Sequence, residues 1–228
     1  MAEELDQAGL DWQGAVPVSR RFADPYFSIA DGLAETRYVF LEGTDLPKRW
    51  RGAQEAHLAE LGFGTGLNML AARELWRRIA APGGRLIITS FEAYPISRAE
   101  LARALAPWPE LDPGPLIAAW PLSTPLDLGD IRVEIIPGDA RRTVPAWPGT
   151  AETWFLDGFA PARNPEMWEP ALLAAVFART TPGGHAATYT AAGHVRRALD
   201  QAGFVVERRP GFAGKRHMTA AKRPPERA

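Results

Sequence analysis

Apolar and polar positions follow two different spacings along most of the chain. Short runs of apolar and β-branched residues, typical of buried strands, recur between stretches in which apolar residues are three and four positions apart, as in helices. Strands are expected at residues 57–61, 85–91, 131–136, 153–156, 185–190, 204–208 and 217–221, and helices at residues 67–80, 97–105, 170–179 and 192–201.

Strands that alternate with helices and are joined by short Gly/Pro loops predict an α/β fold, a mostly parallel sheet with helices on both faces. About eight residues separate the last two strands, too few for a crossover helix, so these two should pair antiparallel. We therefore expect seven strands with an antiparallel last strand. Ser97 and Glu100 have capping-box spacing, and the Gly129-Asp130 turn can pair residues 126–128 with the following strand.

The first 50 residues have a different pattern. Residues 38–41 (YVFL) suggest a strand, and the remainder is expected to form an N-terminal extension that packs on a core domain at residues 51–228. The acidic N-terminus lacks the apolar core of a signal peptide, and no stretch approaches the ~20 apolar residues that cross a bilayer. A cytoplasmic protein without a membrane partner is expected.

Composition narrows the possible chemistry. The 228 residues are 46% hydrophobic with a formal net charge of -1, as in ordinary globular proteins. The absence of cysteine excludes disulfides, thiolate metal sites and catalytic thiols. Because the four histidines (His57, His185, His194 and His217) lack metal-ligand spacing, no metal site is expected. Residues 179–228 carry +7 and the rest -8, which fits either a polyanion-binding surface or ordinary solvated charge.

The segment ELGFGTGLN, residues 60–68, lies between an expected strand and an expected helix. Its glycines Gly62, Gly64 and Gly66 allow a tight turn and a close approach of a ligand to the backbone. The preceding Glu60 would repel a pyrophosphate but suits a ligand with a cationic amino-acid part. S-adenosylmethionine fits this description, and a glycine turn without function is the alternative.

Polar residues at the ends of the next strands are further candidates for binding S-adenosylmethionine. Glu92 ends its strand, where an acid can accept both hydroxyls of a ribose, and Gly138 and Asp139 are placed to meet an adenine. A surface glutamate and a plain Gly-Asp turn are the alternatives. The candidate residues for S-adenosylmethionine are Glu60, Gly62, Gly64, Thr65, Gly66, Asn68, Glu92, Gly138 and Asp139.

Asp157 ends the strand at residues 153–156, and ligands of open α/β sheets bind outside the carboxyl ends of strands. The stiff loop after it contains Pro161, Asn164 and Pro165, which suits a shaped pocket wall, although the prolines could simply form turns. Trp168 fits the core and the site equally well.

Four segments together resemble the methyltransferase domain of the MnmC family of tRNA 5-methylaminomethyl-2-thiouridine biosynthesis proteins, a group of class I S-adenosylmethionine-dependent methyltransferases. They are residues 26–41 (YFSIADGLAETRYVFL), 60–68, 156–168 (LDGFAPARNPEMW) and 193–197. The resemblance implies methyl transfer to the exocyclic amine of 5-aminomethyl(-2-thio)uridine at the tRNA wobble position, with S-adenosylhomocysteine as product. No flavin is expected, since no second nucleotide-binding turn follows, so a separate enzyme should supply the aminomethyl group.

Specific roles follow from this resemblance and from chemistry. Asp157 is the candidate catalytic carboxylate, which positions the amine and favours proton loss from the methylated product. The uracil site is expected to be built from Tyr26, Phe27, Phe159, Pro161, Asn164 and Trp168, with core packing as the alternative for the aromatic residues. Candidates for contact with tRNA phosphates are Arg196, Arg197, Arg208, Arg209, Lys215 and Arg216.

Two other functions remain open at this point: a class I methyltransferase acting on a small amine or hydroxyl compound, and a non-catalytic RNA-binding module. The absence of cysteine counts against methylation of C5 of the uracil ring, which normally needs a thiolate to attack C6. Methylation of an amine needs no such covalent help.

Overall fold

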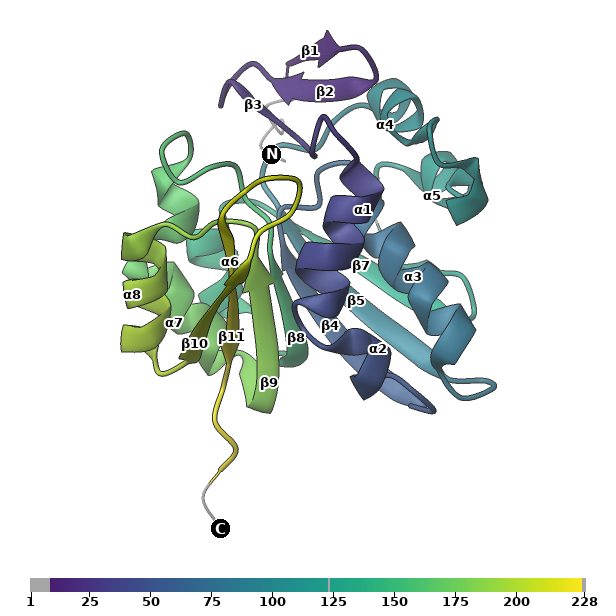
Figure 1. Cartoon of the computed structure of the whole chain (residues 1–228). Coiled ribbons are helices and arrows are strands. Elements are labelled where there is room, and N and C mark those ends of the chain that lie inside the picture. The colour runs from purple at the N-terminus through teal and green to yellow at the C-terminus, as the bar shows by residue number, and fades with distance from the viewer. Residues whose placement is uncertain (1–8, 123, 227–228) are drawn as a thin grey trace.

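Two sheets and the helices around them make up the protein (Figure 1). The computed structural model describes residues 9–122 and 124–226. Within them, the larger sheet has eight strands in the order β10-β11-β9-β8-β4-β5-β7-β6, and the smaller has the order β1-β2-β3. The strands are β1 (Leu10–Gln13), β2 (Val16–Ser19), β3 (Asp24–Pro25), β4 (Glu55–Leu61), β5 (Arg85–Glu92), β6 (Leu126–Asp127), β7 (Ile131–Pro137), β8 (Ala151–Leu156), β9 (Thr180–Thr188), β10 (Val205–Pro210) and β11 (His217–Lys222).

The larger sheet confirms the expected α/β fold, with one correction to its strand number. β4, β5, β7, β8 and β9 are parallel to one another, and β10 pairs antiparallel with β11 as expected. The sheet has eight strands rather than seven because β6 adds a short antiparallel edge strand through the Gly129-Asp130 turn. The parallel strands bring Leu61, Glu92 and Leu156 to the same edge.

Helices cover both faces of the larger sheet and form two apolar clusters. Alternate residues of β4 enter different clusters: Ala56 and Leu58 join one, and Ala59 and Leu61 the other. The capping box of Ser97 and Glu100 is confirmed. The helices are α1 (Gly32–Thr36), η1 (Arg37–Glu42), α2 (Leu46–Arg49), α3 (Leu67–Ile79), α4 (Arg98–Leu105), η2 (Pro109–Leu111), α5 (Gly114–Ala119), α6 (Ala140–Ala146), η3 (Pro165–Trp168), α7 (Pro170–Ala178) and α8 (Gly193–Ala202).

The expectation of a strand at residues 38–41 is wrong, because this segment is part of the π-helix η1. Asp31 caps the preceding α1 by accepting a hydrogen bond from the Ala34 N–H, and the chain continues from α1 into η1 without a break. Val39, Phe40 and Leu41 are all buried in the same apolar cluster. A continuous apolar run without helical spacing can be a buried helix or a buried strand, so the pattern of residues 38–41 does not distinguish the two.

Several of residues 9–50 pack into the same apolar cluster as strands of the larger sheet. Leu33, Phe40 and Trp50 belong to the apolar cluster that also includes α3. Strands β1 to β3 lie beside α4 at the top of the molecule, where the Arg103 guanidinium is 3.8 Å from the ring centroid of Trp12 (Figure 1). None of the helices in the described ranges is long and apolar enough to cross a membrane.

Candidate active site

A cavity of about 400 Å³ opens at the carboxyl ends of the parallel strands. Its walls come from segments far apart in the sequence: residues 22–28, the glycine turn after β4, the end of β5 and the loop after β8. The expected site residues that line it are Tyr26, Phe27, Gly62, Gly64, Thr65, Asn68, Glu92, Gly138, Asp157, Phe159, Asn164 and Lys215. The volume is within the range of about 300–1,000 Å³ that is typical of small-molecule sites.

The glycine turn connects β4 to α3. Gly62, Gly64 and Gly66 all have positive φ angles, of +83°, +55° and +72°, which only glycine adopts readily. At Gly62 a Cβ atom would lie 2.6 Å from the backbone oxygen of Asp157, so the turn also needs the space that glycine leaves. The glycines therefore bring the start of α3 against the end of β8.

Replacing Gly62 by alanine should disrupt the site through this close contact. Gly52 is a matched control, because its φ is +69° but a Cβ atom added there would have no neighbour within 4 Å. We expect Gly52→Ala to cost about 1–2 kcal/mol in unfolding free energy from backbone strain alone. Gly62→Ala should cost more and should also weaken ligand binding at the turn at least tenfold. Denaturant unfolding and calorimetric titration with S-adenosylmethionine measure both effects, and equal results for the two variants would contradict this account.

Glu92 lies at the end of β5, as expected, and faces the same cavity. Its Oε2 accepts a hydrogen bond of 3.0 Å from the Gly64 N–H, and its Oε1 accepts one of 2.7 Å from the Tyr94 N–H. Burial raises the pKa of Glu92, while backbone N–H groups oppose that shift. Backbone N–H groups therefore fix the orientation of this carboxylate at the cavity.

Asp157, Asn68 and Glu60 form a buried polar cluster behind the glycine turn. The Asn68 Nδ2 donates to the Asp157 Oδ2 at 2.6 Å and to the Glu60 Oε1 at 2.9 Å. The Asn68 Oδ1 accepts from the Thr36 hydroxyl at 2.8 Å, and the Ser90 hydroxyl donates to the Glu60 Oε2. Both N–H groups of Asn68 are thus occupied by carboxylates. Glu60 is completely buried and does not line the cavity.

The two carboxyl groups of this cluster have raised pKa values. Burial raises the pKa of Glu60 to about 8 and that of Asp157 to about 7, and the hydrogen bond from Asn68 partly offsets both shifts. The charge of Glu35 raises the pKa of Asp157 further, and that of Lys215 lowers it. A carboxyl group with a pKa near 7 in a cavity can accept a proton at neutral pH.

Aromatic rings form another part of the cavity wall. Phe22 stacks on Phe159 with ring centroids 4.8 Å apart, and the edge of Tyr26 meets Phe159 at 5.0 Å. Tyr94 contacts Phe22 edge to face. Phe22, Tyr94 and Glu35 line the cavity but are missing from the sequence prediction, and only the position of Tyr94, two residues after Glu92, could have indicated it.

Three further candidate residues lie outside the cavity lining. Asp139 caps α6 by accepting from the Arg141 N–H and is also paired with the Arg141 side chain. Trp168 is buried, and its indole N–H donates to the backbone oxygen of Phe159, so it holds the backbone of that loop in place. Pro161 lies in the loop after β8. Their assigned roles in ligand binding remain predictions.

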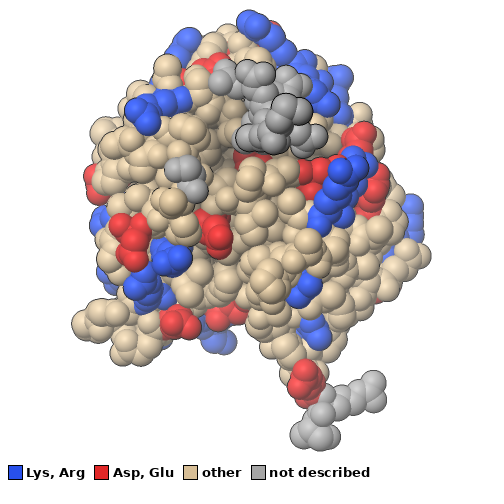
Figure 2. Space-filling view, turned by 180° about the vertical axis from the view of Figure 1, so that it is seen from behind, with Lys and Arg blue, Asp and Glu red and all other residues tan. Residues whose placement is uncertain are grey.

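The basic residues near the C-terminus separate into two groups. Arg209 is paired with Glu207 and reaches the Gly43 carbonyl, and Lys215 points into the cavity. The other residues gather on the α8 side: desolvation, followed by the charges of Arg208, Arg216 and Arg196, lowers the pKa of His217. On the rear face of the molecule, basic and acidic atoms are interspersed (Figure 2).

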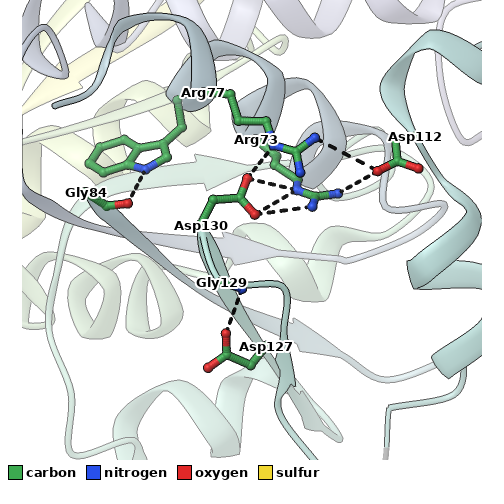
Figure 3. Close-up of polar contacts among 8 residues, drawn as sticks. Arg73, Arg77, Gly84, Asp112, Asp127, Gly129 and Asp130 are labelled. Carbon is green, nitrogen blue, oxygen red and sulfur yellow. Dashed lines mark hydrogen bonds and ion pairs between the residues drawn. The ribbon is translucent and has the colours of Figure 1, made fainter. Parts of the chain in front are cut away.

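A second polar cluster lies away from the cavity, between α3 and the turn from β6 to β7 (Figure 3). The Arg73 side chain, only 4% exposed, bonds to Asp130 at 3.1 Å, and Arg77 bonds to the same carboxylate at 2.6 Å. Asp112 adds a longer contact to Arg73. No group of His, Cys, Asp or Glu side chains that could hold a metal ion occurs in the described part of the chain.

Comparisons with known proteins agree with the fold. Residues 116–224 match the model of a family described as S-adenosyl-L-methionine-dependent methyltransferases. The crystal structure of MnmC2 from Aquifex aeolicus superposes with a TM-score of 0.77 at 24% identity, covering 99% of this chain and 74% of that one. Just under half of the chain is thus similar to S-adenosyl-L-methionine-dependent methyltransferases, and the whole fold is similar to that of this crystal structure.

Its curated relatives are bifunctional MnmC proteins of tRNA 5-methylaminomethyl-2-thiouridine biosynthesis. The protein from Caulobacter sp. (strain K31) is 50% identical in an alignment 226 residues long, which covers 92% of this chain and 37% of that protein. The protein from Pseudomonas paraeruginosa (strain PA7) is 43% identical, over 94% of this chain and 35% of the relative. The chain thus spans little more than a third of the length of these relatives.

Proposed function

We propose that the chain transfers a methyl group from S-adenosylmethionine to the exocyclic amine of 5-aminomethyl(-2-thio)uridine at the wobble position of tRNA. The observation that carries the proposal is the position of Asp157, a carboxyl group with a pKa of about 7 in a cavity that also contains the glycine turn and the aromatic wall. The choice of tRNA as the substrate rests on the names of the relatives, which are tRNA 5-methylaminomethyl-2-thiouridine biosynthesis proteins.

The residues at the sheet edge fit S-adenosylmethionine. Gly62 and Gly64 line the cavity in a turn that a Cβ atom would push against the Asp157 backbone and the Tyr26 ring, and Glu92 faces the same cavity with acceptor oxygens for a ribose. Glu60 acts indirectly in this proposal, since it contacts Asn68 rather than the cavity. When bound, S-adenosylmethionine supplies an electrophilic methyl group on a positively charged sulfur.

The side chains of this protein must bring a neutral amine to that methyl group. An alkylamine has a pKa near ~10, by analogy with lysine, and is mostly protonated at neutral pH. Asp157 accepts a proton from the bound ammonium and leaves a lone pair on nitrogen. Most of the rate gain then comes from alignment, because Phe22, Tyr26 and Phe159 hold the uracil ring in one orientation.

The tRNA backbone would lie against the residues on the α8 side. The charges of Arg208, Arg216 and Arg196 together lower the pKa of His217, so this side of the molecule carries several positive charges that suit phosphate oxygens. The substrate's aminomethyl group must come from another reaction, so the enzyme that supplies it is a functional partner in this proposal.

A methyl-transfer assay tests the proposal directly. The purified chain and radiolabelled S-adenosylmethionine are incubated with three acceptors: an unmodified tRNA transcript, the same tRNA carrying 5-aminomethyluridine at the wobble position, and free 5-aminomethyluridine. We expect label to enter the aminomethyl tRNA at least 100-fold faster than either of the others.

The other possible results of this assay would each indicate one of the two alternative functions. Equal labelling of the free nucleoside would indicate a small-molecule methyltransferase and contradict the tRNA substrate. Binding of tRNA without labelling of any acceptor would indicate a non-catalytic RNA-binding module.

A further inference from the structure

An ion pair inside the cavity plays no part in the function proposed above. The Lys215 Nζ lies 2.6 Å from the Glu35 Oε1, although the two residues are 180 positions apart in the sequence. Glu35 comes from α1 and Lys215 from the hairpin between β10 and β11, and both line the same cavity as Asp157. Lys215 was a candidate for contact with tRNA phosphates, but here its ammonium group is already neutralised.

The surroundings of this ammonium group form a preformed cation site. The Glu35 side chain is 11% exposed, and its second oxygen accepts a hydrogen bond from the Ser28 N–H, which fixes the carboxylate in place. The Lys215 Nζ also lies 4.7 Å from the centre of the Tyr189 ring, within the range of a cation–π contact. The Tyr189 hydroxyl in turn donates to the Gly158 carbonyl, next to Asp157.

A primary ammonium on a carbon chain is also the group that the proposed substrate carries. We propose that Glu35 and the ring face of Tyr189 receive the ammonium group of the substrate, and that Lys215 occupies this site until the substrate displaces it. This inference rests on the proposed function for the identity of the ligand. The substrate would thus bind as a cation beside Asp157, before that carboxylate takes its proton.

Displacement of Lys215 is physically reasonable. Its side chain is 46% exposed, so it can turn outward into water while Glu35 stays in place. Holding a lysine in one conformation costs up to about 2 kcal/mol of side-chain entropy. A substrate that is also held by base stacking does not depend on this one contact.

Steady-state kinetics with aminomethyl tRNA tests the displacement, with Lys215→Met as the main variant because methionine has a similar length and no charge. We expect Lys215→Met to lower KM about 3- to 10-fold at pH 8.5, since the competitor is gone and the Asp157 carboxyl, whose pKa the Lys215 charge lowers, is ionised in both proteins at this pH. Glu35→Gln should raise KM about 10-fold. In the double variant, with Glu35→Gln and Lys215→Met together, the second change should no longer lower KM, because the carboxylate for which Lys215 and the substrate compete is gone.

A role in binding phosphate predicts opposite results. If Lys215 contacts tRNA, Lys215→Met raises KM and lowers the slope of log affinity against log salt by about one. Either change would overturn the proposal. Thermal unfolding of each variant, compared with the wild type, identifies any change in KM that comes from a damaged fold.

A second measurement needs neither tRNA nor methyl transfer. Chemical shifts of the Lys215→Met protein are followed during titration with ethylammonium chloride, with potassium chloride at equal ionic strength as the control. Saturable binding to Lys215→Met, and its loss in the double variant, is the expected result, and absence of binding to Lys215→Met overturns the inference. Because no transfer is measured, ethylammonium can bind even if the tRNA function proves wrong.

Discussion

Replacing Asp157 by asparagine is expected to lower kcat about 10²- to 10⁴-fold, the usual contribution of a general base. The amide has nearly the same shape, and its oxygen can still accept the hydrogen bond that Asn68 donates to Asp157. What it loses is the ability to take a proton. Affinity for S-adenosylmethionine, measured by calorimetry, should stay within about threefold of the wild type, because chemistry rather than binding is affected.

The pH dependence provides an independent check of the same residue. Burial raises the pKa of Asp157 to about 7, and only the ionised carboxylate can accept a proton, so this contribution is lost as pH falls below about 7. The ratio of wild-type to Asp157→Asn rates should therefore shrink about tenfold per pH unit below 7. Protonation of the substrate amine affects both proteins and cancels in this ratio. A constant ratio between pH 5.5 and 8 would show that Asp157 is not the base.

Replacing Asn68 by alanine should have the largest effect on stability. The completely buried Glu60 would lose a donor, at a cost of about 1–3 kcal/mol in unfolding free energy, and Asp157, which lines the cavity, would lose the same donor. Their raised pKa values mean that ionisation opposes folding, so stability falls as pH rises towards about 8. Asn68 stabilises the ionised forms, and its removal should therefore cost more at pH 8 than at pH 6.

Ser90→Ala is the matched control for this prediction. It removes a hydrogen bond from Glu60 but leaves the one to Asp157 intact. We expect Asn68→Ala to shift the acidic limb of the pH–rate profile to higher pH, because Asp157 loses a donor that lowers its pKa. Ser90→Ala should leave the limb at the same pH. Urea unfolding at pH 6 and 8 and the two pH–rate profiles are the measurements. If both variants move the limb equally, Asn68 does not act through Asp157.

The central part of the fold could be predicted from the sequence because its signals are local. The strand before Gly62, the glycine turn and the helix after it are adjacent in sequence, and the structure has each in its expected place. The capping box at Ser97 and the antiparallel final pair also depend on short spacings. The error at residues 38–41 arose where buried helices and strands have the same apolar composition.

The cavity walls were harder to predict because they depend on long-range contacts. Phe22 meets Phe159 across more than 130 residues, and Glu35 meets Lys215 across 180. Neither Phe22 nor Glu35 has a neighbour in sequence that marks it as functional. Asn68 was expected at the cofactor site, and only coordinates show that its amide spans two carboxylates.

The cluster of Arg73, Arg77 and Asp130 restrains α3, the helix that follows the glycine turn. Arg73 and Arg77 attach the later turns of this helix to Asp130, while Asn68 attaches its first turn to Asp157. A helix attached at both ends cannot slide along its axis, so Gly62, at the start of the turn, is already in position before any ligand arrives. Such preorganisation spares a ligand the entropy cost of ordering its own binding loop.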